Sequence, residues 1–206
     1  MANFIQINAE HPQPRLIRQV ADILAAGGIV AHPTDTTYAL GVHMNNHRGV
    51  DHLYQIKKKR LSRPLSFLCA DLSDLSEYAK VTDEAFYIMK RLLPGPYTFI
   101  LEARKNAPRI AWTKRKEIGL RAPGNHIVQD LIRAIGCPMI STSASLPTGE
   151  LLSDPREILD FYGHQIDVVI DAGIIFPEPS TIISFTTGSL QVIRLGKGPV
   201  DFLDKL

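Results

Sequence analysis

Cysteine is scarce in this sequence, and its two copies form no pattern. The 206 residues contain only Cys69 and Cys137. Two isolated thiols make no C-x-x-C pair and no zinc-ligand spacing. The sequence therefore predicts two reduced thiols in a cytoplasmic protein. Cys69 follows Leu65-Ser66-Phe67-Leu68 and is expected to be a small buried hydrophobe.

Long apolar runs are missing as well. No run approaches the roughly 20 apolar residues that a membrane span needs. Residues 1–10 contain neither a basic segment nor a long apolar segment, so they do not resemble a secretory signal. We therefore expect no membrane partner.

The familiar motifs of nucleotide and hydrolase chemistry are also absent. Gly196-Lys197 is followed by Gly198, so it does not complete a phosphate-binding G-K-[ST] sequence. The chain has no G-x-G-x-x-G, H-E-x-x-H or G-x-S-x-G motif. Four histidines, at positions 32, 43, 47 and 52, have spacings that fit no single metal-binding face. The sequence predicts no metal site.

Ordinary composition and interleaved periodicities predict a globular α/β protein. Apolar residues make up 45% and charged residues 21% of the chain. We predict one domain over residues 1–206, with a mixed, twisted sheet and helices on both faces. The expected helices are 14–26, 49–59, 71–79, 82–93, 126–135 and one that begins at Pro155. Asp71 and Thr82 are expected to cap the third and fourth of these helices. Expected strands are 4–8, 28–31, 65–70, 97–103, 118–122, 138–142, 167–171, 181–185 and 190–195.

Positive charge is concentrated in two sets, although the formal net charge is only +2. The first is Lys57, Lys58, Lys59, Arg60 and Arg63; the second is Arg104, Lys105, Arg109, Lys114, Arg115, Lys116 and Arg121. Each set is explained equally well by a solvated face. If both lie on one face, they form a surface suited to phosphates.

Residues 33–41, PTDTTYALG, crowd hydroxyl and carboxyl side chains behind a short apolar run. Such side chains can satisfy local backbone groups in a tight turn. They can equally face outward and bind a small polar ligand. The residues alone leave both interpretations open.

This segment resembles the signature of the YrdC/YciO family, which includes the threonylcarbamoyl-AMP synthases. Further segments resemble family motifs in the family's order, and the chain is most similar to the YciO branch. They are residues 94–101 (PGPYTFIL), 118–123 (IGLRAP), 141–145 (STSAS), 180–183 (STII) and 192–196 (VIRLG).

The resemblance implies a YrdC-like fold with a basic concave face, and an enzyme that makes threonylcarbamoyl-AMP. ATP with Mg²⁺, L-threonine and bicarbonate or CO₂ would be its ligands, and its product would serve tRNA modification. The family's nucleotide-binding positions fall on Lys57, Lys59, Arg60, Ser143, Ser145 and Arg194. Its substrate-binding positions fall on Thr34, Arg121, Ser141 and Ser180.

Two positions depart from the family pattern. Without gaps, the Arg position of its K-x-R-P motif holds Lys59 and the Pro position holds Arg60, whereas a shift by one residue would instead pair Lys58 with Arg60. Ser145 replaces the Asn of its S-x-S-A-N motif. Lys offers phosphate a point charge instead of a planar fork, and Ser cannot reproduce both hydrogen bonds of an amide.

These departures favour an alternative, a double-stranded RNA- or tRNA-binding protein with little or no synthase activity. Its RNA-binding residues would be Lys57, Lys58, Lys59, Arg60, Arg63, Lys114, Arg115 and Lys116. An ATP-handling enzyme with another amine or acid substrate is a third interpretation.

Overall fold

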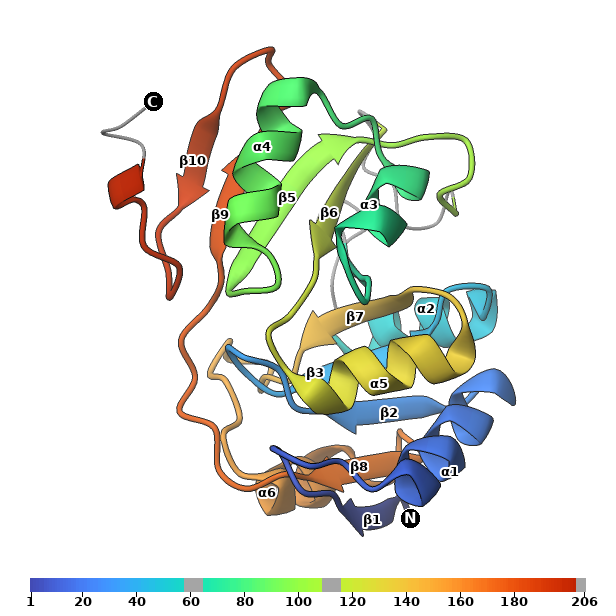
Figure 1. The fold of residues 1–206 in the computed structure, drawn as a ribbon. Helices are drawn as coiled ribbons and strands as arrows, with labels where there is room; N and C mark the ends of the chain where they lie inside the picture. The colour runs from blue at the N-terminus through green and yellow to red at the C-terminus, as the bar shows by residue number, and fades with distance from the viewer. Residues whose placement is uncertain (58–64, 109–115, 203–206) are drawn as a thin grey trace.

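A mixed sheet of ten strands runs through the part of the chain that the structure describes (Figure 1). The computed structural model describes residues 1–57, 65–108 and 116–202. The strand order is β1-β8-β2-β3-β7-β4-β6-β5-β9-β10. In chain order the strands are β1 (Asn3–Gln6), β2 (Ile29–His32), β3 (Ala39–His43), β4 (Ser66–Leu68), β5 (Tyr97–Glu102), β6 (Glu117–Arg121), β7 (Met139–Ser143), β8 (Val168–Asp171), β9 (Thr181–Ser184) and β10 (Gln191–Arg194).

Four neighbouring pairs are parallel and the others antiparallel, which confirms the predicted mixed sheet. The parallel pairs are β1–β8, β2–β8, β4–β6 and β5–β9. The sheet twists strongly, so that β2, β3 and β7 run across β5 and β6 in Figure 1. This twist brings the ends of distant strands together.

Six helices accompany these strands within the described ranges. They are α1 (Pro14–Ala25), α2 (His47–Ile56), α3 (Leu72–Tyr78), α4 (Asp83–Leu92), α5 (His126–Ile135) and α6 (Pro155–Tyr162). The caps predicted at Asp71 and Thr82 are confirmed, because their side chains accept backbone hydrogen bonds at the starts of α3 and α4. None of the helices in these ranges is long and apolar enough to cross a membrane.

Helices cover both faces of the sheet, as predicted. Successive strand residues point to opposite faces. In β2, Ile29 and Ala31 belong to the larger of two apolar clusters, whereas Val30 belongs to the smaller one. Side chains of α2, α3, α4 and α6 complete the larger cluster, and those of α1 and α5 complete the smaller cluster.

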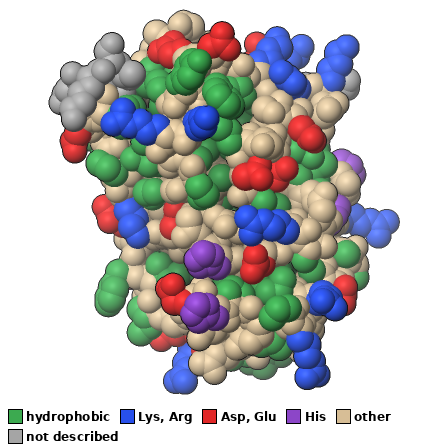
Figure 2. Space-filling view, in the orientation of Figure 1, with side chains coloured by type: hydrophobic (Ala, Val, Ile, Leu, Met, Phe, Trp, Pro, Cys, Tyr) green, Lys and Arg blue, Asp and Glu red, His purple; other side chains and the backbone are tan. Residues whose placement is uncertain are grey.

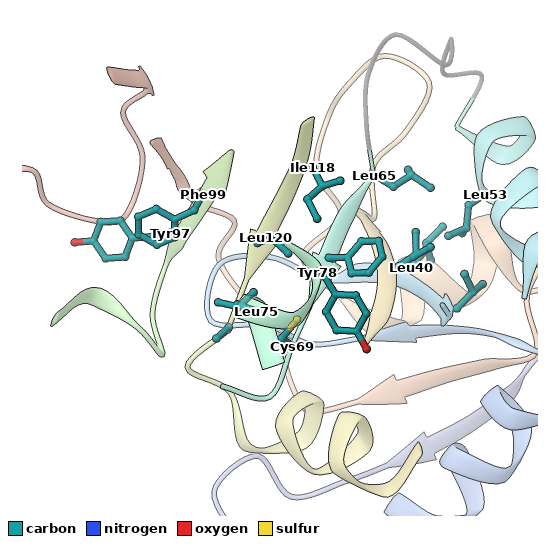
Figure 3. Packing of buried hydrophobic residues seen from close by; sticks show 14 of the residues in the cluster. Leu40, Leu53, Leu65, Cys69, Leu75, Tyr78, Tyr97, Phe99, Ile118 and Leu120 are labelled. Carbon is teal, nitrogen blue, oxygen red and sulfur yellow. The ribbon is translucent and has the colours of Figure 1, made fainter. Parts of the chain in front are cut away.

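Aromatic and aliphatic side chains fill the larger cluster densely. Figure 3 shows Tyr97 and Phe99 of β5 side by side, with ring centroids 6.3 Å apart. Cys69 lies beside Leu75 in the same view, fully buried and unpaired. This confirms that Cys69 is a small buried hydrophobe.

One predicted boundary is wrong. The segment 33–41 was expected to be a single tight segment behind a strand, but only residues 33–38 form the connection. Residues Ala39–His43 form β3, which lies between β2 and β7 with its backbone paired on both sides. The apolar side chains Leu40 and Val42 drive this pairing, because both are fully buried.

Candidate functional site

On the sheet face that α1 and α5 cover, the side chains change from apolar to polar at the ends of the strands. Val30 of β2 is followed on the same face by His32, and Met139 of β7 by Ser141. Arg121 of β6 lies on this face too, because it is the register partner of Leu68. All three polar side chains are buried. The sheet therefore carries three buried polar side chains at the border of the region that α1 and α5 cover.

Thr34 organises the connection between β2 and β3. Its hydroxyl accepts hydrogen bonds from the backbone N–H groups of Thr36 and Thr37, both at 3.1 Å. It also donates to the carbonyl oxygen of Thr37 at 2.6 Å. The turn interpretation of Thr34 is thus confirmed. Its contact with a substrate stays a prediction.

Arg121 forms an ion pair with Asp35 of this connection. Nη2 of Arg121 lies 2.6 Å from Oδ1 of Asp35, and the two side chains are only 10% and 12% exposed. Oδ2 of Asp35 also accepts a hydrogen bond from the Gly124 N–H at 3.0 Å. Burial lowers the pKa of Arg121, whereas the charge of Asp35 raises it. Nε of Arg121 is buried without a hydrogen-bond partner among the described residues, so its N–H is a donor that this part of the chain does not use.

His32 is neutral and is held between two oxygen atoms. Burial lowers its pKa to about 4. Nδ1 lies 3.1 Å from the carbonyl oxygen of Pro33, which can only accept, so Nδ1 carries the proton. Nε2 then accepts from the hydroxyl of Ser141 at 3.3 Å. This pair fixes the direction of the Ser141 hydroxyl.

Ser180 and Arg194, a predicted substrate contact and a predicted nucleotide contact, are hydrogen-bonded to each other. Nε and Nη2 of Arg194 donate to the Ser180 carbonyl oxygen at 3.1 and 2.7 Å. The Ser180 hydroxyl lies 2.8 Å from that of Thr98. Arg194 is close enough to Arg121 for its charge to lower the pKa of Arg121.

Lys57 and Ser145, both predicted nucleotide contacts, touch each other. Nζ of Lys57 donates to the carbonyl oxygen of Ser145 at 2.7 Å and also to its hydroxyl. The hydroxyl of Tyr162 in α6 donates to the same carbonyl oxygen. These contacts join the end of α2 to the segment after β7. The Ala144 N–H bonds to the Tyr38 carbonyl oxygen at 2.8 Å, which places this contact beside the 33–38 connection.

Other predicted residues lie elsewhere or cannot be placed. Ser143 is exposed at the end of β7. Lys58, Lys59, Arg60, Arg63, Lys114 and Arg115 lie outside the described residues. Lys116 precedes β6, whereas Arg121 is its last residue, so the strand separates them. The basic concave face stays a prediction.

Sequence reasoning gave no role to Asp35, Lys197 or Tyr162. Nζ of Lys197 donates to the carbonyl oxygen of Asp35 at 2.6 Å. The one available signal for Asp35 was its place in the crowded 33–41 segment. Lys197 lies between Gly196 and Gly198, so the sequence does not complete the G-K-[ST] motif of a phosphate-binding loop. Tyr162 carried no signal that separates it from a core aromatic residue.

The arrangement suits a small anion. Arg121 and Lys197 both contact Asp35 of the 33–38 connection, and Arg194 lies close enough to Arg121 for its charge to lower the pKa of Arg121. Among the described residues, Asp35 is the only acid that forms an ion pair with any of these three cations. In the described ranges, no group of three or more His, Cys, Asp or Glu side chains could hold a metal ion. The site can therefore bind carboxylate or phosphate through guanidinium, ammonium and hydroxyl groups.

Comparison with known sequences identifies relatives along almost the whole chain. The Sua5/YciO/YrdC family model, described as "Telomere recombination", matches residues 22–196. The chain is 41% identical to YciO of Escherichia coli K12 over 202 residues, which cover 97% of this chain and 98% of that protein. It is 31% identical to a Methanocaldococcus jannaschii protein provisionally named a threonylcarbamoyl-AMP synthase, over 94% of this chain and 92% of that protein.

Solved structures show the same fold. The crystal structure of E. coli YciO matches with a TM-score of 0.94 and 40% identity, and the match covers 98% of both chains. P. abyssi Sua5 in complex with L-threonine matches with a TM-score of 0.91 and 26% identity, over 98% of this chain and 60% of that chain. The predicted YrdC-like fold is confirmed, and the chain belongs to the Sua5/YciO/YrdC family.

Proposed function

We propose that this protein makes threonylcarbamoyl-AMP from L-threonine, bicarbonate or CO₂, and ATP, with release of pyrophosphate. One observation carries the proposal: Arg121 and Lys197 both contact Asp35, Arg194 lies near Arg121, and the Asp35 carboxylate is the single acid that pairs with any of these cations among the described residues. The excess of positive charge suits the anionic groups of both substrates, because threonine carries a carboxylate and ATP carries several phosphate charges.

Binding of threonine is assigned to the buried part of the site. The guanidinium of Arg121 keeps a free Nε–H donor for the threonine carboxylate, while Asp35 holds its other end in place. The Ser141 hydroxyl, directed by neutral His32, lies on the same face. A buried, pre-oriented guanidinium loses little freedom when it binds a carboxylate.

The reaction would proceed by positioning and electrostatics. The threonine amine attacks the carbon of CO₂, forms a C–N bond and loses a proton to solvent. A carbamate oxygen then attacks the α-phosphorus of ATP, and the bond to the pyrophosphate oxygen breaks. Lys57 and Arg194 would neutralise the phosphates, with Mg²⁺ carried in by the nucleotide. Lys59, Arg60 and Ser143 stay predicted nucleotide contacts.

Two relatives support this assignment. The P. abyssi Sua5 structure contains L-threonine, and the M. jannaschii relative is provisionally named a threonylcarbamoyl-AMP synthase. Residues 22–196, the family region, include the site from Thr34 to Arg194. The product would supply the threonylcarbamoyl group for modification of adenosine in tRNA.

A product assay tests the proposal. Purified protein is incubated with ATP, Mg²⁺, L-threonine and ¹³C-bicarbonate, and the products are separated and weighed by mass spectrometry. We expect a labelled threonylcarbamoyl-AMP that needs all three substrates, and no product from Arg121→Ala. Pyrophosphate release that does not depend on threonine would contradict the threonine assignment. ATP binding without any product would favour the second candidate.

RNA binding is the second candidate, and one surface feature favours it. A hollow at the far end of β5 and β6 is lined by Lys80, Glu102, Ala103, Arg104, Lys105, Asn106 and Lys116. Glu102 pairs with Lys80 at 2.6 Å. The charges of Arg104, Lys105 and Lys116 have no acidic partner among the described residues. Figure 2 shows Lys and Arg side chains at this end of the molecule, with Asp and Glu side chains beside them; the unpaired cations suit a phosphate backbone.

A further inference from the structure

The segment Gly196–Gly198 follows β10 and passes beside the site. Neighbouring atoms leave no room for a side chain at Gly196 or Gly198. A Cβ on Gly196 would lie 2.0 Å from the carbonyl oxygen of Pro179, and one on Gly198 would lie 2.4 Å from the ring of Tyr97. Any side chain at either position must push the segment away from its neighbours. Lys197 is thus the one residue of the three that can carry a side chain.

Hydrogen bonds tie the same segment to the start of β9. The Lys197 N–H donates to the Pro179 carbonyl oxygen at 2.9 Å. The Thr181 hydroxyl accepts from the Gly196 N–H at 3.0 Å and donates to the Gly198 carbonyl oxygen at 2.6 Å. The backbone of Lys197 is therefore held in place, although its side chain is exposed.

The ammonium group of Lys197 lies at the site with a weak partner. Its hydrogen bond goes to the carbonyl oxygen of Asp35, 162 residues away, and not to a carboxylate. The carboxylate of Asp35 is used by Arg121 and by the Gly124 N–H. A neutral carbonyl compensates a cation less than an anion does. Lys197 can exchange this contact for an anionic ligand at little cost.

We propose that Lys197 binds a phosphate group of the nucleotide in this site, which rests on the proposed function. Arg121 accounts for the single charge of an amino-acid carboxylate. The several charges of a polyphosphate need further cations, and Lys197 is a compact point charge that suits phosphate oxygens. The segment Gly196–Gly198 thus performs the role of a phosphate-contacting lysine without a phosphate-binding loop.

Substitution of Lys197 tests the proposal. Lys197→Gln should weaken ATP binding about tenfold in calorimetric titration, whereas threonine affinity stays within twofold. Lys197→Arg keeps the charge and should retain most of the ATP affinity. Lys90→Gln, an exposed lysine on α4, is the matched control and should change neither affinity. Gly198→Ala keeps every charge but displaces the segment, so it too should weaken ATP binding.

The outcomes separate this inference from the proposed function. If the wild-type protein binds ATP and Lys197→Gln binds it equally well, the inference is wrong and the proposed function stands. If Lys197→Gln weakens threonine binding instead, Lys197 contacts the carboxylate and the phosphate assignment is wrong. If the wild-type protein binds no ATP, both fail together. Thermal melting of each variant shows whether it is folded; Lys197 is exposed, so its variants remain informative even if Gly198→Ala unfolds.

Discussion

Arg121 and Asp35 form a nearly buried ion pair across 86 residues of sequence, with an Nη2–Oδ1 distance of 2.6 Å. The pair links the end of β6 to the connection between β2 and β3. It has two consequences that can be measured separately. One is structural, because each charge needs the other when both are buried. The other is functional, because Arg121 is the proposed partner of the threonine carboxylate.

Arg121→Ala should lower both stability and threonine affinity. The substitution leaves the Asp35 carboxylate buried without its cation, so unfolding in urea should show a loss of roughly 3 kcal/mol. Adding Asp35→Asn should recover part of that loss. Threonine binding should weaken far more than ATP binding. The control Arg133→Ala breaks an exposed pair with Asp130 and should cost less than about 1 kcal/mol. Normal threonine binding by the Arg121 variant would reduce this residue to its structural role.

Ser145→Asn should tighten ATP binding. The Ser145 hydroxyl now accepts a hydrogen bond from Lys57. An Asn oxygen can accept the same bond while its amide N–H groups remain free for the nucleotide. We expect a gain of roughly 1 kcal/mol in calorimetric titration. Ser73→Asn, an exposed position on α3, is the matched control. Equal affinities of Ser145→Asn and the wild-type protein would remove Ser145 from the nucleotide site.

Acidification should destabilise the protein through His32. The pKa of His32 is lowered to about 4 in the folded state, from 6.5. Between these values the unfolded state binds more protons, so stability falls as the pH falls through this range. The loss should be about 2 kcal/mol between roughly pH 7.5 and pH 5. His32→Gln should remove this part of the pH dependence in urea unfolding. The control His11→Gln, at an exposed position, should keep it. Parallel pH profiles for all three proteins would contradict the assignment to His32.

Duplex RNA binding should depend steeply on salt if the basic hollow is an RNA site. The triple variant Arg104→Gln, Lys105→Gln and Lys116→Gln should reduce the log–log salt slope by about two to three units, because each lysine or arginine on a phosphate releases about one counterion. Fluorescence anisotropy measures the slope. The matched control neutralises Arg15, Arg18 and Lys90, which are exposed on α1 and α4. ATP binding should be unaffected by the triple variant, since the hollow lies at the far end of β6 from Arg121. A slope near zero in the wild-type protein would exclude the RNA-binding candidate.

Local signals in the sequence were sufficient for most of the elements. The helix predicted at 126–135 has those bounds in the structure, because an apolar stripe sets its face and Gly136, at φ +69°, ends it in the left-handed conformation. Asp71 and Thr82 act as the predicted caps because a cap contacts only the next three residues. Such contacts join residues that are neighbours in the sequence, so they can be predicted without knowledge of the fold.

The tertiary structure alone decided how the site is assembled. β3 was missed because the alternation of Leu40 and Val42 is too short to mark a strand by itself, and its place between β2 and β7 is set by pairing with distant segments. Asp35 meets Arg121 across 86 residues and Lys197 across 162, and Lys57 meets Ser145 across 88. No local pattern encodes these distances. They follow from the order of strands and the twist of the sheet, which bring the ends of β2, β6 and β10 to one place.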